Sequence, residues 1–206
     1  MKNRLTIAVF LCIGAVSAAI AQPARTPDVP YVPTPPEVVE AMLKAANVKA
    51  GDVVYDLGSG DGRIVITAAK KYGSTGTGVD INPYLVEVAR QNAKKEGVAD
   101  KVKFEVGDIF EFDFSKATVV TLYLMPDINL KLRPILWGKL QPGTRIVSHA
   151  FSMGDWKPER TIDVNGSNVY LWTIPARGTK DPSEAVKPDP KASPKPRAAP
   201  SPAGGM

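Results

Sequence analysis

The sequence predicts an α/β fold: a doubly wound, mostly parallel sheet of the Rossmann-like type that closes with an antiparallel hairpin. Three observations support this prediction. Short β-branched runs alternate with amphipathic helical stretches, a glycine-rich loop joins the first run to the next helix, and two strands joined by a turn end the pattern. With 206 residues, 44% of them hydrophobic, the chain can form one such domain, predicted over residues 37–174.

The first 21 residues predict a signal peptide or an uncleaved signal anchor. Lys2 and Arg4 precede an apolar run, and Ala19-Ile20-Ala21 then offers small residues of the kind that a signal peptidase reads. The uncharged stretch, residues 5–21, is slightly shorter than the ~20 residues that a spanning helix needs. We therefore expect a protein that is exported (periplasmic or secreted), or one that associates with the membrane through this leader.

Proline-rich segments flank the predicted domain. Six of the 19 prolines lie in residues 22–36, a lead-in, and eight lie in residues 175–206, which are also rich in Ala, Lys and Ser. The second segment buries too little apolar surface to offset chain entropy, so we expect a disordered tail. The net charge of +5 comes from the leader and the tail, whereas residues 37–174 carry equal numbers of acidic and basic side chains. This neutral core disfavours nucleic acid as a partner.

The elements of the domain follow in order. Thr34-Pro35-Pro36-Glu37 is typical of a capping box, with Thr34 as the cap of a first helix. The apolar stripe of that helix consists of Val38, Val39, Met42, Leu43 and Ala46. A buried strand over residues 52–57 leads into the glycine loop, a second helix ends at Gly73, and residues 75–81 are the next predicted strand.

The second half continues the alternation. Asn82-Pro83 is predicted to cap a third helix that ends at Gly97 and turns Leu85, Val88 and Ala89 inward. The remaining predicted elements are strands at 102–106, 118–124 and 144–151, a helix at 127–140 containing Pro134, and hairpin strands at 161–164 and 169–174 joined by residues 165–168. Trp156 and Trp172 are expected to pack the hairpin. In such a sheet a ligand binds at the carboxyl ends of the first strands.

The loop DLGSGDG, residues 56–62, is where we expect the polar head of a cofactor. Its backbone N–H groups and the following helix N-terminus are expected to face outward toward that head. The spacing differs from the dinucleotide pattern G-x-G-x-x-G/A, because Arg63 stands where the last glycine would be. Asp56 can accept hydrogen bonds from an ammonium group, so the ligand is expected to carry an amino acid.

Two more carboxylates follow the next strands. Asp80 lies 22 residues after Gly58, the spacing at which a carboxylate binds the two hydroxyls of a ribose. Asp108 can accept from an adenine amine while Ile109 packs on the ring. A single acid at a strand end is as often a cap or turn former. Three of them beside one glycine loop favour an adenosine that bears an amino acid, which is S-adenosylmethionine.

On these residues the sequence resembles the seven-strand class I methyltransferases, through DLGSGDGR (56–63), GVDINP (78–83) and GDIF (107–110). With YVPTP (31–35) and LYLMP (122–126) it is similar to the small protein-lysine methyltransferases of the ATP synthase c-subunit and adenine nucleotide translocase type. The resemblance implies methyl transfer to a lysine amine, with Tyr31 and Thr34 over the methionine end of the cofactor. The other expected cofactor-binding residues are Asp56, Gly58, Ser59, Gly60, Gly62, Asp80, Ile81, Asp108 and Ile109.

Methyl transfer depends on positioning more than on acid–base strength. Tyr123 is the best candidate for the wall beside the methyl group, and an ordinary core aromatic is the alternative. His149, the only histidine, is a candidate proton acceptor, with a purely structural role as the alternative. The only cysteine, Cys12, lies in the leader, and no metal site is expected. Residues 123–126 read YLMP, whereas nucleic-acid amine methyltransferases carry N/D-P-P-Y/F, which also disfavours a nucleic-acid substrate.

The predicted export of the domain conflicts with its predicted cofactor, because S-adenosylmethionine is made in the cytosol. The domain is then supplied by a transporter, acts on the cytosolic side, or is an exported relative without turnover. Three hypotheses follow: a protein-lysine methyltransferase, a small-molecule methyltransferase, and a binding module that keeps the adenosine site without catalysis. The intact acids at three strand ends favour the two enzymes.

Overall fold

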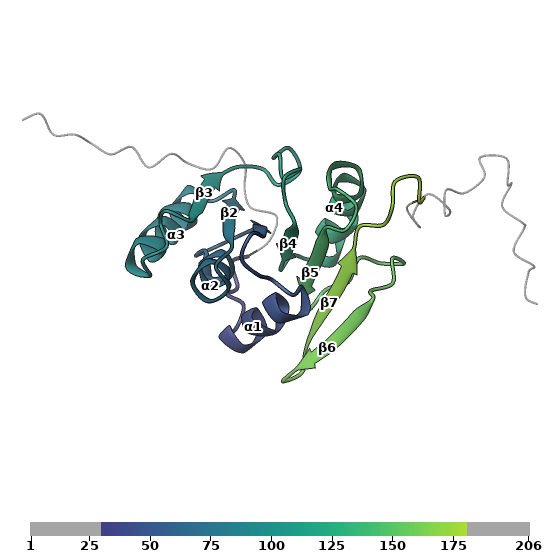
Figure 1. The fold of residues 1–206 in the computed structure, drawn as a ribbon, viewed down its shortest axis with the longest axis horizontal. Helices are drawn as coiled ribbons and strands as arrows, with labels where there is room; N and C mark the ends of the chain where they lie inside the picture. The colour runs from purple at the N-terminus through teal and green to yellow at the C-terminus, as the bar shows by residue number, and fades with distance from the viewer. Residues whose placement is uncertain (1–29, 181–206) are drawn as a thin grey trace, which may run out of the picture.

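A seven-stranded sheet crosses the centre of the molecule in a computed structural model that describes residues 30–180 (Figure 1). The strands are β1 (Val53–Leu57), β2 (Thr75–Asp80), β3 (Val102–Val106), β4 (Val119–Leu122), β5 (Arg145–His149), β6 (Arg160–Val164) and β7 (Ser167–Thr173). Their order is β3-β2-β1-β4-β5-β7-β6, with parallel pairing from β3 to β5 and antiparallel pairing of β7 with both β5 and β6. The predicted fold class is confirmed.

Several predicted segments fall outside this range. The leader, residues 1–21, lies outside the described residues, as do residues 22–29 of the lead-in and 181–206 of the tail. Within residues 30–180, no helix combines the length and apolar character needed to cross a membrane. The helices and strands extend from Pro36 to Thr173, against the predicted limits of 37 and 174.

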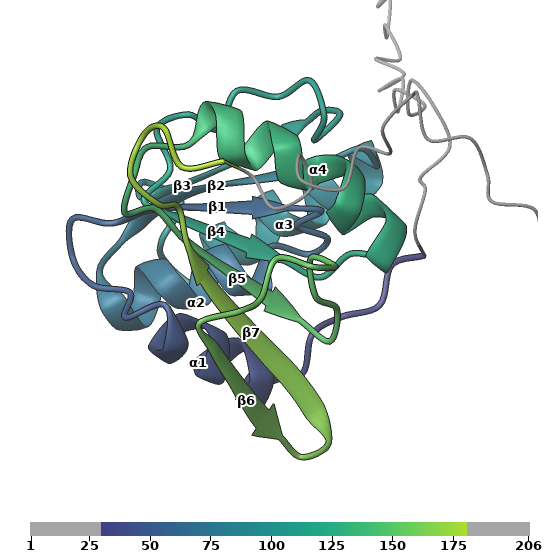
Figure 2. The ribbon, with the colours of Figure 1, turned by 90° about the vertical axis from the view of Figure 1, so that its right-hand side faces the viewer.

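Helices cover both faces of the sheet (Figure 2). They are α1 (Pro36–Ala45), α2 (Arg63–Tyr72), α3 (Pro83–Lys95) and α4 (Pro126–Lys139). Figure 2 shows α4 on one face and α1 and α2 on the other, and buried residues of α2 and α3 share a core cluster with β3. Leu132 and Leu136 of α4 pack with Leu122 and Ile146 of the sheet. Because both faces are covered, all four residues of β4 are buried, as predicted for this strand.

The prediction that Thr34 caps the first helix is wrong. The cap position of α1 is Pro35, whose backbone is extended (φ −58°, ψ 147°), and no side chain bonds to the first turn. Two successive prolines delay the helix by one residue, so Thr34 lies too far from the free amides to reach them. The buried stripe of α1 agrees with the prediction: Val38, Val39, Met42, Leu43 and Ala46 are all buried.

The structure also corrects details of the later elements. On α3 the buried residues are Val86, Ala89 and Ala93, whereas the predicted inward pair Leu85 and Val88 is only partly buried. The cause for Leu85 is its place in the first turn of α3, where it lines a pocket instead of the core.

The hairpin turn has two residues, not four. Asn165 and Gly166 both have positive φ (54° and 84°), as a mirror-image turn requires, so Ser167 and Asn168 belong to β7. Strand β5 stops at His149 because Ala150 has φ +63°. As expected, both tryptophans pack beside the hairpin in the core, where the indole N–H of Trp172 donates to the carbonyl of Trp156 over 2.9 Å.

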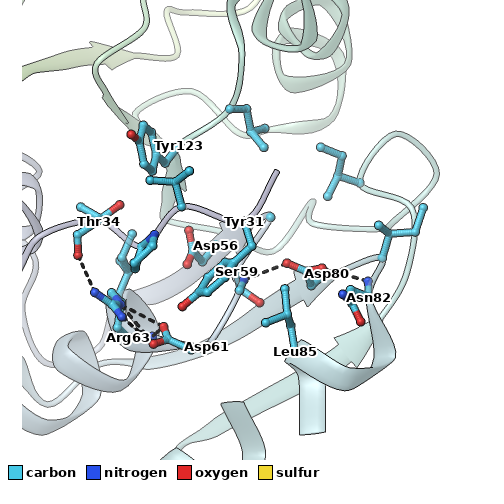
Figure 3. A pocket seen from close by; sticks show the side chains of 18 of the residues that line it. Tyr31, Thr34, Asp56, Ser59, Asp61, Arg63, Asp80, Asn82, Leu85 and Tyr123 are labelled. Atoms are coloured by element: carbon cyan, nitrogen blue, oxygen red, sulfur yellow. Dashed lines mark hydrogen bonds and ion pairs between the residues drawn. The ribbon is translucent and has the colours of Figure 1, made fainter. Parts of the chain in front are cut away.

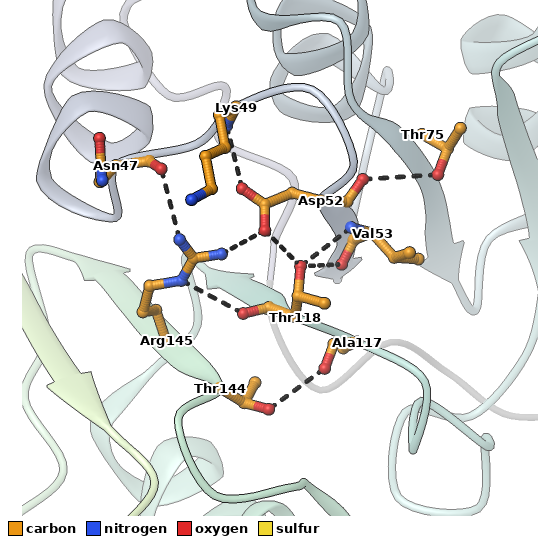
Figure 4. Close-up of polar contacts among 9 residues, drawn as sticks. All are labelled: Asn47, Lys49, Asp52, Val53, Thr75, Ala117, Thr118, Thr144 and Arg145. Atoms are coloured by element: carbon orange, nitrogen blue, oxygen red, sulfur yellow. Dashed lines mark hydrogen bonds and ion pairs between the residues drawn. The ribbon is translucent and has the colours of Figure 1, made fainter.

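A partly buried polar cluster ties the central strands together at their amino ends (Figure 4). The Asp52 carboxylate accepts from the Thr118 hydroxyl (2.7 Å) and the Lys49 amide (2.9 Å), and it pairs with Arg145. Burial alone would raise the pKa of Asp52, but these hydrogen bonds and the guanidinium outweigh it and hold the pKa below its usual value. The cluster joins β1, β4 and β5 at the edge of the sheet opposite to the pocket described next.

Candidate functional site

One pocket opens at the carboxyl ends of the parallel strands (Figure 3). It lies where β1 is flanked by β2 on one side and β4 on the other, the point at which the strand order reverses and α/β sheets bind ligands. Among the predicted site residues, the pocket is lined by Tyr31, Thr34, Asp56, Gly58, Ser59, Gly60, Asp80, Ile81, Asp108, Ile109 and Tyr123. Gly62 and His149 are not part of the lining.

The glycine loop is shaped by three residues with positive φ: Gly58 (85°), Gly60 (52°) and Gly62 (81°). Glycine is required at two of them for space as well. A Cβ on Gly60 would lie 2.4 Å from the Tyr31 ring, and one on Gly62, the cap residue of α2, would lie 2.6 Å from the Phe104 ring. The absence of a side chain at Gly62 therefore lets the loop pack against Phe104 of β3, and its absence at Gly60 lets the Tyr31 ring lie against the loop.

The expectation that the loop amides face outward is wrong for four of them. The amides of Gly58 and Ser59 both donate to the Val79 carbonyl (2.8 and 2.9 Å), and that of Gly62 donates to the Ser59 carbonyl (2.9 Å). The Gly60 amide donates to the Asp80 carboxylate over 2.8 Å. Buried amides need partners, and these find them inside the protein. The side chains, more than the amides, are thus left to bind a ligand.

Asp56 is the most deeply buried acid of the pocket, with 3% of its surface exposed. The Thr121 hydroxyl donates to its carboxyl oxygen over 2.6 Å. Burial above all, together with the charges of Asp80 and Asp61, raises the pKa of Asp56 to about 7, against the lowering effect of the Thr121 hydrogen bond. Nearby, the buried Ser59 hydroxyl has no hydrogen-bond partner among residues 30–180. Both groups suit a cationic, hydrogen-bonding ligand.

Asp80 and Asp108 follow the neighbouring strands on the same edge. The two oxygens of Asp80 accept one amide each, from Gly60 (2.8 Å) and Asn82 (2.9 Å), and burial raises its pKa. A carboxylate has about four acceptor positions, so Asp80 can accept two more hydrogen bonds. Asp108 accepts from the Phe110 amide (2.9 Å) and lines the pocket together with Ile109.

Residues 30–34, the N-terminal strap, cross the pocket beside the loop. The Arg63 guanidinium donates to the Thr34 carbonyl over 2.9 Å, and it is itself held by the Asp61 carboxylate over 2.7 to 3.3 Å. Burial would raise the pKa of Asp61, but Arg63 outweighs it and keeps the pKa below its usual value. Sequence reasoning missed this role for both residues. An arginine two positions after an aspartate at a helix start was the available signal.

An aromatic group stands at the other end of the pocket. Tyr123 directly follows β4, and its ring centroid lies 3.9 Å from that of His149 and 6.3 Å from that of Phe151. His149 is 3% exposed and reaches Thr34 of the strap, with Nδ1 and Oγ1 3.4 Å apart. Within residues 30–180, no three His, Cys, Asp or Glu side chains are placed to hold a metal ion.

Comparison with known proteins places this site in a family. The ANTKMT methyltransferase domain matches residues 56–160. A protein-lysine N-methyltransferase of Saccharolobus islandicus is 47% identical over 153 residues, which cover 72% of this chain and 95% of that protein. The chain belongs to the ANTKMT methyltransferase family. The predicted class, a methyltransferase dependent on S-adenosylmethionine, is confirmed at the level of this family.

Two further relatives are informative about this methyltransferase. The human lysine N-methyltransferase of the ATP synthase c-subunit is 36% identical over 174 residues, which cover 79% of this chain and 74% of that protein. A crystal structure of an RNA methyltransferase from Salinibacter ruber, in complex with S-adenosyl-L-homocysteine, is 59% identical. It covers 73% of this chain and 98% of its own, with a TM-score of 0.71.

The geometry of the methyltransferase site changes the prediction made for His149. Its side chain does not line the pocket and lies behind Tyr123 and Thr34, so it does not face the pocket as a proton acceptor would. The positive φ of Ala150 ends β5 immediately after His149 and turns the chain away. Besides Asp61 and Arg63, the prediction omitted other residues that line the pocket, among them Leu85 and Ile128. Phe151 does not line the pocket but lies beside Tyr123.

Proposed function

We propose that this methyltransferase transfers a methyl group from S-adenosylmethionine to the ε-amine of a lysine in a protein. The observation that carries the proposal is the placement of Asp56, Asp80 and Asp108, from three adjacent strands, in one pocket beside the glycine loop. The family and the lysine methyltransferases among its relatives support the acceptor class. When bound, S-adenosylmethionine supplies an electrophilic methyl group on a sulfonium.

Each acid has a part in holding the cofactor. The Asp56 carboxylate takes the ammonium of the methionine end, and the nearby Ser59 hydroxyl gives that end a further hydrogen-bonding group. Asp80 uses its two remaining acceptor positions for the ribose hydroxyls. Asp108 accepts from the adenine amine while Ile109 packs on the ring. Tyr31 and Thr34 cover the methionine end from the strap.

The acceptor lysine enters beside Tyr123. At pH 7 the loss of its proton costs about 4.6 kcal/mol from a reference pKa of ~10.4. Leu124 and Ile128 line this part of the pocket and provide the apolar surroundings that lower the pKa of an amine. The remaining work of the site is to hold the amine in line with the methyl group and to exclude water.

RNA is the second candidate acceptor, because the Salinibacter ruber relative is named an RNA methyltransferase. The surface around the pocket favours protein instead. The large apolar side chains that are exposed, Tyr31, Val32, Tyr84, Val106, Met125 and Leu130, belong to the strap or to segments at the carboxyl ends of β2, β3 and β4. Arg63 is the only Lys or Arg in the pocket lining, and Asp61 neutralises it. Binding to a phosphate backbone requires several unpaired cations.

The test combines binding with identification of the product. Calorimetry with S-adenosylmethionine and S-adenosylhomocysteine comes first, with Asp80→Ala expected to weaken binding by about 1–3 kcal/mol. The protein is then incubated with methyl-labelled cofactor and whole-cell extract. Protease-sensitive label that yields methyl-lysine on hydrolysis supports the proposal. Ribonuclease-sensitive label, label in the small-molecule fraction, or tight binding without any label contradicts it and supports the RNA, small-molecule or binding-module alternative respectively.

We also propose that residues 1–21 bring the domain to a membrane, as a cleaved export signal or as an anchor. Their charge pattern, two basic residues before an uncharged run, supports this. Fractionation of cells that express the full chain, with the intact mass of the recovered protein, tests it. Full-length protein in the soluble cytosolic fraction contradicts the proposal.

A further inference from the structure

Behind the pocket, His149 touches two parts of the site that are far apart in sequence. Its ring packs against Tyr123, with centroids 3.9 Å apart and planes inclined by 36°, and its Nδ1 lies 3.4 Å from the Thr34 hydroxyl. Thr34 belongs to the strap, 115 residues away. The imidazole therefore links the strap to the Tyr123 ring.

Thr34 is held at both ends. Its carbonyl accepts from Arg63 at the start of α2, and its hydroxyl meets His149 at the end of β5. Arg63 holds the strap at the end of the glycine loop, and His149 holds it beside Tyr123. A change at His149 must then affect the strap, which covers the cofactor, as well as Tyr123, which faces the acceptor.

The backbone around His149 is itself held in an uncommon conformation. Ala150 has φ +63°, and the Phe151 amide donates to the His149 carbonyl over 2.8 Å, which together describe a tight γ-turn. Three further hydrogen bonds hold the turn: Ser148 Oγ and Asn129 Nδ2 donate to the Phe151 carbonyl (2.7 and 3.3 Å), and the Ala150 amide donates to Asn168 (2.7 Å). Such strain persists only where the surroundings determine the position fully.

The surroundings of the His149 imidazole favour its neutral form. Its neighbours are uncharged: Thr34 from the strap, Tyr123 after β4, and Val169, its partner on β7. Burial lowers the pKa of His149, and no charged group among residues 30–180 opposes this effect. A neutral imidazole has one donor and one acceptor nitrogen, which suits a fixed contact with a hydroxyl.

We propose that His149 is a positioning residue, which fastens Thr34 over the cofactor and supports Tyr123 beside the acceptor without taking a proton from it. This inference rests on the proposed function. It predicts that the two contacts can be separated by substitution. Thr34→Val and His149→Phe remove the same hydrogen bond, whereas His149→Asn keeps a polar atom near Nδ1 and removes the ring face from Tyr123.

The kinetic test follows from this separation. Thr34→Val, His149→Phe and their double variant are each expected to weaken cofactor binding about fivefold, the order expected for one hydrogen bond, with no added loss in the double variant. His149→Asn is expected to keep cofactor affinity within about twofold and to lower kcat about tenfold. The pH profile of kcat keeps its shape in all of them. Additive losses in the double variant, or a limb of that profile lost with His149, overturn the proposal.

A second measurement needs no variant at this position. Because the chain has one histidine, an untagged protein labelled with ¹⁵N-histidine gives imidazole signals from a single ring, one for Nδ1 and one for Nε2. We expect one tautomer of the neutral ring at pH 8, with or without cofactor, and a changed Nδ1 shift in Thr34→Val. A ring that titrates at the midpoint of the kcat profile shows a proton acceptor and refutes the inference. The NMR signal does not depend on turnover. Failure of the proposed function would instead be seen in the other assays, as absent cofactor binding or absent methyl-lysine.

Discussion

The buried carboxyl of Asp56 leads to a prediction about stability and pH. Its pKa is about 7 in the folded protein, against 3.8 for the free side chain. Because the folded state binds the proton more tightly, the stabilisation is complete below the unfolded pKa and is lost as the pH rises to the folded pKa. A difference of about three pH units corresponds to about 4 kcal/mol.

Asp56→Asn tests this magnitude, because the amide keeps an oxygen for the Thr121 hydroxyl but cannot ionise. Urea unfolding between pH 4 and pH 8 gives the free energy of unfolding of wild type and of Asp56→Asn. In the difference between the two proteins, the contributions of the other acidic residues cancel. Wild type is expected to lose about 4 kcal/mol relative to the variant over this range. A difference that stays constant within about 1 kcal/mol refutes the reasoning.

The same carboxyl shapes cofactor affinity. If Asp56 binds the ammonium of the cofactor, it must be ionised, so affinity falls by up to tenfold per pH unit below about 7. Above about 8 the α-amino group of the cofactor loses its own proton. Calorimetry should therefore find tightest binding between pH 7 and 8 in wild type, and no acidic limb in Asp56→Asn. An identical acidic limb in both proteins contradicts the assignment.

Three further substitutions, one of them with a matched control, test the framework of the site and of the sheet. Gly60→Ala should weaken cofactor binding about tenfold, because the added Cβ meets Tyr31. The control Gly97→Ala also lies at positive φ but has nothing within 4 Å of its Cβ, so it should only lower stability by about 1 kcal/mol. Equal cofactor affinity in the two variants contradicts this prediction. Arg63→Met should release the strap, seen as faster proteolysis near residue 34 and about tenfold weaker cofactor binding; unchanged proteolysis argues against the clamp. Asp52→Asn should lower the free energy of unfolding by about 2 kcal/mol and leave cofactor affinity unchanged. Unchanged stability with altered cofactor affinity contradicts a purely structural role for Asp52.

Much of the fold could be predicted from the chain because its signals are local. The spacing of apolar residues along the sequence distinguishes strands from helices. Gly73 marks a helix end through its left-handed backbone, and Asn82-Pro83 marks a helix start. Element ends were less predictable. Because a proline disfavours helical backbone in the residue before it, Pro36 made Pro35 the cap of α1. The sign of φ at Ala150 shortened β5. This second change does not follow from residue type alone, because packing elsewhere selects the backbone angle.

The placement of the three acids at one edge of the sheet follows from the order of residues along the chain. Parallel strands all point the same way, so side chains at the carboxyl ends of β1, β2 and β3 must meet there whatever the packing. The contacts among residues distant in sequence, in contrast, depend on the folded arrangement. Thr34 reaches His149 over 115 positions, and the loop amides are bonded to Val79 and Asp80 instead of facing the pocket. Such pairings depend on strand register and on which polar groups burial leaves without water, and no local pattern of residues encodes either.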